Sequence, residues 1–210
     1  MKVKLCGIKR PEDIVFMNEF LPDYVGFVFA GTKRLVSPEK AAGLAQHLDG
    51  IVKRVGVFVN APPKFIVRTV NLVGLDVIQL HGDETAQDIA ALRKLLPGVE
   101  IWKAVRVRDR ESIPAALRLG ADLLLLDSFS KSEYGGTGKA GNFSLIREAN
   151  LKVPFFLAGG LNRENLRSAI QELSPYGVDI SSGIETDGVK DRRKIEQIMW
   201  ILNGSGKVGI

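Results

Sequence analysis

The sequence is poor in the residue types that build disulfides and metal sites. Its 210 residues include a single cysteine, Cys6, and two histidines, His47 and His81. One cysteine forms no internal disulfide, which suits the reducing cytoplasm. Two isolated histidines without cysteine partners argue against a structural zinc site.

Long apolar runs are missing as well. No stretch approaches the ~20 residues that a membrane-spanning helix needs. The first residues have the pattern of a strand rather than that of a signal peptide. We therefore expect a cytoplasmic protein without a membrane partner.

Aromatic residues make up only 7% of the chain, and the lysines and arginines are spread beside acids rather than clustered. A nucleic-acid-binding protein needs a basic stripe with stacking side chains. The formal net charge of +5 therefore favours a small anionic substrate over nucleic acid.

What the sequence does contain is a regular alternation of short apolar, strand-like runs with helical stretches. The runs cover residues 3–6, 24–29, 54–59, 76–80, 100–105, 122–127, 154–158 and 177–181. Ser37 and Pro38 have the pattern of an N-cap followed by a first-turn proline. The last helix shows an apolar stripe of Ile195, Ile198, Met199 and Leu202. Asp83, Asp109, Asn142 and Asn162 are the expected caps of four other helices.

Eight such β–α repeats without a linker-like change in composition predict one (β/α)8 barrel domain over residues 1–210. A doubly wound open sheet is the alternative. It would ordinarily contain fewer strands, and eight parallel strands are the number that closes a barrel of this kind.

Polar side chains fall at the carboxyl ends of several runs, where barrel enzymes place their active sites. Cys6 ends the first run, and Asp127 ends the sixth after four leucines. An acid is costly to bury unpaired, so Asp127 is expected to have a partner or a catalytic role. Cys6 alone is also consistent with a buried small hydrophobe. His81 is expected to be structural or to contact a substrate.

Glycines concentrate after the last two runs, at residues 158–162 and 181–185. Barrels of this class commonly bind phosphate in these two loops. Glycine lets backbone N–H groups approach an anion, and a helix N-terminus adds a favourable dipole. The two loops therefore predict a phosphate site.

A third glycine-rich stretch, residues 135–141, only superficially matches nucleotide-binding motifs. It fits G-x-G-x-x-G, but it lies several residues beyond its strand, and the next strand does not end in an acid. It is not a Walker loop, because Glu133 stands where the first glycine belongs and Ala140 follows Lys139.

These residues together resemble the phosphoribosylanthranilate isomerase family, beginning with Lys4-Leu5-Cys6-Gly7-Ile8. The other matching blocks are residues 26–29, 33–38, 55–60, 79–82, 126–127, 134–139, 159–162 and 178–185. The blocks follow in order along almost the whole chain, which makes the resemblance specific. One departure is Gly141-Asn142-Phe143 before Ser144, where the family usually has an aromatic residue, Asp and Trp.

The resemblance implies an Amadori rearrangement in tryptophan biosynthesis, converting N-(5-phosphoribosyl)anthranilate to a carboxyphenylamino deoxyribulose phosphate. It implies that Asp127 is the general acid that opens the ribose ring and that Cys6 is the general base at C2. Arg34 matches the position that pairs with the anthranilate carboxylate, and His81 and Asp179 are expected to contact the substrate. Residues Gly159, Gly160, Ser181, Ser182 and Gly183 match the phosphate loops. Only protons move, so no cofactor or metal is implied.

The chemistry sets conditions on both catalytic groups. A thiol with a pKa of about 8.5 serves as a base if positive charge from Lys4 or a substrate iminium lowers it. The apolar strand favours the protonated form of Asp127 that an acid needs.

Two other function classes stay open on sequence alone. One is a different phosphate-binding barrel isomerase or lyase, although such sites commonly use paired carboxylates or metals. The other is a non-catalytic phosphosugar-binding or assembly subunit, which needs neither Cys6 nor Asp127. A monomer and a homodimer are both consistent with the sequence.

Overall fold

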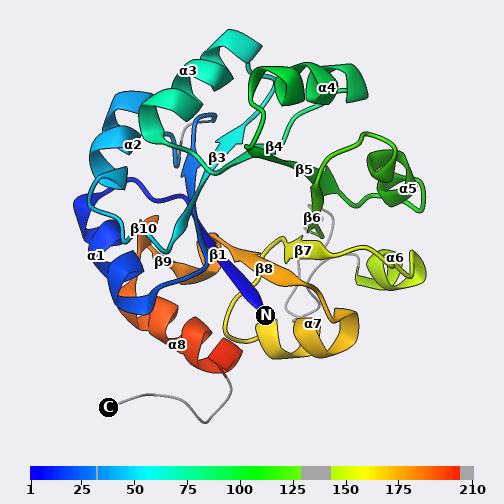
Figure 1. The fold of residues 1–210 in the computed structure, drawn as a ribbon. Helices are drawn as coiled ribbons and strands as arrows, with labels where there is room; N and C mark the ends of the chain where they lie inside the picture. Colours follow the sequence, from blue (N-terminus) through cyan, green and yellow to red (C-terminus); the bar gives the residue numbers. More distant parts are fainter. Residues whose placement is uncertain (32, 129–142, 204–210) are drawn as a thin grey trace.

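The structure is a computed structural model that describes residues 1–31, 33–128 and 143–203. Its parallel strands close into a barrel in the order β1 to β8, with helices around the outside (Figure 1). The strands are β1 Lys2–Cys6, β2 Tyr24–Val28, β3 Lys53–Phe58, β4 Val77–Leu80, β5 Glu100–Arg106, β6 Leu123–Asp127, β7 Phe155–Ala158 and β8 Gly177–Ile180. The helices are α1 Pro11–Phe20, α2 Pro38–Ala45, α3 Pro63–Val73, α4 Ala86–Leu95, α5 Ser112–Leu117, α6 Phe143–Glu148, α7 Leu166–Leu173 and α8 Arg192–Asn203.

The closure between β1 and β8 decides between the two predicted architectures. These strands pair in parallel, with Lys4 opposite Asp179. The predicted (β/α)8 barrel is confirmed, and the open-sheet alternative is wrong because the first and last strands are hydrogen-bonded neighbours. None of the helices in the described part of the chain is long and apolar enough to cross a membrane.

Alternation along each strand separates two cores. Val3 and Leu5 pack outward in the cluster that also contains Ile14 and Met17 of α1. Lys4 and Cys6 therefore face the inside of the barrel, since successive side chains point to opposite faces.

The inside of the barrel is filled near its amino-terminal end by aromatic rings. Tyr24 lies 4.9 Å from Trp102 and 5.7 Å from Phe156, measured between ring centroids. Trp102 and Phe156 are fully buried. The polar inward-facing residues therefore lie above these rings, toward the carboxyl-terminal end of the strands, where the predicted site lies.

The helix ends show which local signals were sufficient. Ser37 caps α2 by accepting a hydrogen bond from Lys40 N at 3.2 Å, as predicted. The expected cap at Asp83 is wrong: Thr85 caps α4, because Thr85 and Asp88 form a reciprocal capping box. Ile195, Ile198 and Met199 of α8 are buried as the stripe predicts, and Leu202 is half-buried.

The expected caps at Asp109 and Asn162 are wrong by two or three residues, since Glu111 and Asn165 stand at the N-cap positions of α5 and α7. Asp109 accepts hydrogen bonds from the backbone N–H groups of Glu111 and Ser112 at the start of α5. Asn162 does the same for two residues in the turn that precedes α7. The expected cap at Asn142 lies outside the described residues.

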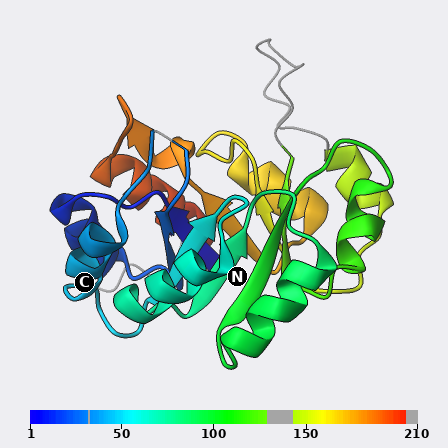
Figure 2. The ribbon, with the colours of Figure 1, turned by 90° about the horizontal axis from the view of Figure 1, so that it is seen from above.

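A short excursion follows β8 and was not predicted. A 3-10 turn, η1 Ser182–Ile184, leads into a hairpin of β9 Glu185–Thr186 and β10 Val189–Lys190, in which Lys190 lies opposite Glu185. The hairpin projects at one end of the barrel (Figure 2). The sequence did contain its signal, since Asp187 and Gly188 both have positive φ and Asp-Gly is typical of tight hairpin turns.

A buried ion pair fixes the end of β4. Lys103 Nζ lies 3.0 Å from Glu84 Oε2, and both side chains are less than a tenth exposed. The same ammonium donates hydrogen bonds to the carbonyl oxygens of Leu80 at 3.3 Å and Gly82 at 2.6 Å. These two residues flank His81, so the pair holds the backbone that carries one of the predicted site residues.

Replacing Glu84 with alanine should destabilise the fold by roughly 3–5 kcal/mol, because it leaves the Lys103 charge buried without a counter-charge. The measurement is the free energy of unfolding in urea. The control is Glu39→Ala, which breaks the Arg68–Glu39 pair, whose side chains are 72% and 62% exposed. That loss should stay within about 1 kcal/mol, and equal small losses in both variants would show that the buried pair stabilises nothing.

Candidate active site

The predicted base and acid lie at the same end of the barrel. Cys6 is the last residue of β1 and Asp127 is the last residue of β6. Because the barrel strands are parallel neighbours, their last residues form one rim. The Cys6 side chain is buried, whereas the Asp127 side chain is 22% exposed.

A buried ion pair lies beneath Cys6 inside the barrel. Lys4 Nζ is 2.9 Å from Asp179 Oδ1, and the Lys4 side chain is completely buried. Burial alone lowers the pKa of Lys4, but the Asp179 carboxylate beside it reverses the effect and the net direction is upward. Lys4 therefore stays an ammonium, and Asp179 is its counter-charge as well as a predicted substrate contact.

The electrostatics of Cys6 correct one expectation. Burial raises the pKa of the Cys6 thiol, and the positive charges of Lys4 and Lys190 only partly offset this. The expected lowering by Lys4 is present, but it is weaker than desolvation and is opposed by Asp179. The raised pKa favours the protonated thiol near neutral pH.

Gly26 of β2 leaves the space that the thiol occupies. A Cβ at this position would lie 2.6 Å from Cys6 Sγ and 3.1 Å from Lys4 Nζ. Any side chain here would displace one of these groups, since atoms do not approach so closely. The glycine in the Gly26-Phe27-Val28-Phe29 block is thus needed to accommodate Cys6.

His81 follows β4 and contacts the predicted acid. Its Nε2 lies 3.8 Å from Asp127 Oδ2, and the imidazole is 26% exposed. Burial lowers the pKa of His81 more than the Asp127 carboxylate raises it. His81 is therefore neutral near neutral pH, and the contact is one between a neutral imidazole and a carboxyl group.

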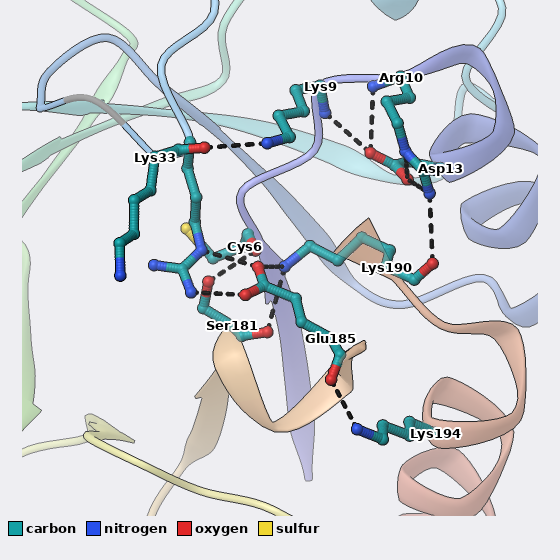
Figure 3. A network of polar contacts seen from close by, with 10 residues as sticks. Cys6, Lys9, Arg10, Asp13, Lys33, Ser181, Glu185, Lys190 and Lys194 are labelled. Carbon is teal, nitrogen blue, oxygen red and sulfur yellow. Dashed lines mark hydrogen bonds and ion pairs between the residues drawn. The ribbon is translucent and has the colours of Figure 1, made fainter. Parts of the chain in front are cut away.

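Arg34 is already paired with a carboxylate of the chain. It donates from Nε to Glu185 Oε1 and from Nη2 to Glu185 Oε2, each at 2.7 Å. Lys190 Nζ also contacts Glu185 Oε1, at 2.8 Å, and donates to the carbonyl oxygen of Ser181 at 3.1 Å. Figure 3 shows the Lys190 nitrogen between Glu185 and Ser181, close to Cys6. Glu185 and Lys190 were not predicted as site residues, because nothing in the sequence shows that the hairpin brings them to Arg34.

The two predicted phosphate loops are packed directly against each other. A Cβ on Gly183 would lie 1.9 Å from the carbonyl oxygen of Leu161, so only glycine fits there. Gly159 and Gly160 both have positive φ, 97° and 68°. Ser181 turns away from this contact, since its hydroxyl donates to the carbonyl oxygen of Cys6 at 3.0 Å.

A cavity of about 610 Å³ opens between these loops and the start of α8. Gly160, Ser182 and Gly183 line it, as do the cations Arg163, Arg193 and Lys194 and the acids Glu164 and Asp191. The cations outnumber the acids, which favours an anion. A second cavity of similar volume, lined partly by His81 and Arg106, lies between the ends of β4 and β5. Among the described residues, no three His, Cys, Asp or Glu side chains gather as metal ligands would.

The fold and this rim define a class of protein: a (β/α)8 barrel enzyme with acid–base side chains at its carboxyl-terminal end. Residues 3–200 match the family model of N-(5′-phosphoribosyl)anthranilate (PRA) isomerase. The chain belongs to this family. The family resemblance drawn from the sequence is therefore confirmed, and unrelated phosphosugar barrels are excluded as its family.

Individual relatives support the same assignment. The isomerase of Thermoanaerobacter pseudethanolicus is 43% identical over 204 residues, which cover 97% of this chain and 98% of the relative. That of Endomicrobium trichonymphae is 45% identical over 201 residues, 96% of this chain and 98% of the relative. The solved phosphoribosyl anthranilate isomerase of Thermotoga maritima is 39% identical and superposes with a TM-score of 0.83, covering 99% of this chain and all of the other.

The pKa of Cys6 can be tested by alkylation, because the chain contains no other cysteine. Iodoacetamide should react with the folded protein only at a pH above that needed for a free thiol. Asp179→Asn removes a carboxylate that raises the thiol pKa, so its reaction profile should move to lower pH. Lys4→Met removes a cation and should move the profile to higher pH. Two profiles that shift in the same direction would contradict the electrostatic assignment.

Proposed function

We propose that the chain converts N-(5′-phosphoribosyl)anthranilate to 1-(2-carboxyphenylamino)-1-deoxyribulose 5-phosphate, with Asp127 as general acid and Cys6 as general base. This reaction is an aldose–ketose isomerisation in tryptophan biosynthesis, an intramolecular oxidoreduction. The observation that carries the assignment of roles is the position of the two side chains, which end β1 and β6 on one rim of a barrel of this family.

The chemistry follows from these positions. Asp127 in its protonated form gives its proton to the ribose ring oxygen, the bond from C1 to that oxygen breaks, and the amine nitrogen forms an iminium with C1. Cys6 as thiolate then removes the proton from C2, leaving an enolamine. The enolamine then tautomerises: its C2 hydroxyl loses a proton, C1 gains one, and C2 becomes the ketone. Asp127 gives one proton, Cys6 takes one, and the tautomerisation leaves the proton count unchanged, so the product is an isomer and no oxidant is consumed.

We place the activation of the base after substrate binding. Burial raises the pKa of the Cys6 thiol, which favours its protonated form near neutral pH. The iminium formed by ring opening adds a positive charge near the thiol, and positive charge favours the thiolate. In this scheme Asp127 acts first, and its action prepares Cys6.

The remaining assignments concern binding. We assign the anthranilate carboxylate to Arg34, and substrate contacts to His81 beside Asp127 and to Asp179 beside Lys4. The phosphate goes to the loops of Gly159, Gly160, Ser181, Ser182 and Gly183. A solved family member, 37% identical and with a TM-score of 0.81, is described as a complex with reduced 1-(o-carboxyphenylamino)-1-deoxyribulose 5-phosphate, a phosphorylated relative of the proposed product.

The proposal extends to the whole chain. Residues 1–210 form one domain that acts on a small phosphorylated anion in the cytoplasm, without a cofactor, a metal or nucleic acid. The proton-only reaction and the single cysteine support these points. The protein is a monomer or a homodimer, and one solved structure is described as monomers generated from the dimeric phosphoribosylanthranilate isomerase of Thermotoga maritima. The departure at Gly141-Asn142-Phe143 leaves Asp127 and Cys6 untouched; Gly141 and Asn142, like the matching block 134–139, lie outside the described residues.

Cys6→Ala and Asp127→Asn should each lower kcat by roughly 10²–10⁴, the range that general acid–base residues supply. Both variants should remain folded, because each change removes or replaces only one or two atoms. The measurement is loss of fluorescence of freshly made phosphoribosylanthranilate. His47→Ala, at an exposed position after α2, is the control. Near-normal turnover by Cys6→Ala would mean that Cys6 is only a buried thiol.

Arg34→Ala should lower kcat/KM about 10- to 100-fold, since a hydrogen bond to a charged group contributes roughly 1.5–3 kcal/mol. Arg34→Lys should restore only part, because an ammonium lacks the planar donor geometry. Inorganic phosphate should inhibit wild type and Arg34→Ala equally. If Arg34→Ala instead weakened inhibition by phosphate but left the preference for carboxylated over carboxylate-free ligands unchanged, Arg34 would bind the phosphate and not the carboxylate.

A further inference from the structure

The Arg34–Glu185 pair joins residues that are far apart in the sequence. Glu185 uses both carboxylate oxygens, at 2.7 Å each, to bind one edge of the guanidinium, formed by Nε and Nη2. The Glu185 side chain is only 10% exposed and that of Arg34 is 30% exposed. Paired geometry of this kind fixes orientation as well as position.

Glu185 is itself held from two further sides. Lys190, whose side chain is 1% exposed, contacts Glu185 Oε1 at 2.8 Å from the opposite strand of the β9–β10 hairpin. Lys194 of α8 donates to the Glu185 carbonyl oxygen at 2.6 Å. Figure 3 shows Glu185 between these two lysines. The carboxylate is therefore an anchored group, and the position of Arg34 follows from it.

The stem of Arg34 lies against the residue after Cys6. Gly7 has φ +88°, and a Cβ there would lie 2.5 Å from Arg34 Cδ. The guanidinium is thus confined between Gly7 and Glu185, next to the end of β1. Among the described residues, none accepts a hydrogen bond from Arg34 Nη1.

The charges leave room for an additional anion. Burial raises the pKa of Glu185, but hydrogen bonds from Arg34 and Lys190 more than offset this and lower it to about 2. Glu185 is therefore anionic at any physiological pH. Glu185 raises the pKa of Arg34, so Arg34 stays positively charged with Glu185 in place and can still attract a substrate carboxylate.

We propose that Glu185 is a positioning residue for carboxylate recognition: it holds Arg34 by the Nε–Nη2 edge and so presents the Nη1 side to the substrate carboxylate. This rests on the proposed function. An Arg side chain that is already ordered loses less conformational freedom on binding, and this favours affinity.

The test measures binding of reduced 1-(o-carboxyphenylamino)-1-deoxyribulose 5-phosphate and of the same compound without the carboxyl group, by calorimetry. Glu185→Gln should weaken binding of the carboxylated compound about 3- to 10-fold, the scale of ordering one long side chain. Binding of the compound without the carboxyl group should not change. Glu185→Asp keeps the charge with a shorter reach and should recover part of the loss.

Two further arms separate positioning from a general effect. Glu19→Gln is the matched control, because Glu19 also binds both Nε and Nη2 of an arginine, Arg192, but between α1 and α8. It should leave both affinities unchanged. In an Arg34→Ala background, Glu185→Gln should have no additional effect, since the group that Glu185 positions is missing.

Provided that the wild-type protein turns over phosphoribosylanthranilate, three results would overturn the inference. Tighter binding of the carboxylated compound by Glu185→Gln would make Glu185 a competitor of the substrate. Equal weakening of both compounds would make its role structural. An undiminished effect of Glu185→Gln in the Arg34→Ala background would mean that it acts without Arg34. Absence of wild-type turnover would instead refute the proposed function, and this inference with it.

Discussion

The site depends on the contact that closes the barrel, the parallel pairing of β1 with β8. That pairing sets Lys4 opposite Asp179, and the ion pair between them lies inside the barrel directly below Cys6. A buried ammonium without a counter-charge is strongly destabilising, so the same closure that completes the fold satisfies Lys4. It also brings Ser181 to the backbone of Cys6. The loop after β8 is thereby fixed beside the predicted base, and the hairpin that follows carries Glu185 and Lys190 to Arg34.

The closure also accounts for the raised pKa of the Cys6 thiol. Lys4 and Lys190 lie near Cys6, but Cys6 is also buried and Asp179 lies nearby. Of these influences, burial has the largest effect on the pKa of Cys6. A buried, protonated thiol is protected from chemistry until charge develops next to it. The proposed iminium supplies that charge at the step that needs a base, which links the proposed order of proton transfers to the electrostatics around Cys6.

Much of the fold followed from local patterns. The β-rich runs predicted the strand positions to within a residue or two. They also predicted that Cys6 and Asp127 lie on one rim, because both end a strand and parallel strands of a barrel end on the same side. Two features had no local signal. The Arg34–Glu185 pair depends on where two separate loops meet, and the direction of the Cys6 pKa depends on the balance of burial against three charged neighbours. The β9–β10 hairpin did have a signal, Asp187-Gly188, but its strands are too short for an alternating pattern to identify.

The most direct test of the central claim is a single-turnover measurement with excess wild-type protein and phosphoribosylanthranilate carrying either hydrogen or deuterium at C2 of the ribose. The account predicts rapid loss of substrate fluorescence with the unlabelled compound and a slower loss with the deuterated one, because Cys6 must break the bond from C2 to its hydrogen. Fluorescence loss no faster than in protein-free solution would contradict it.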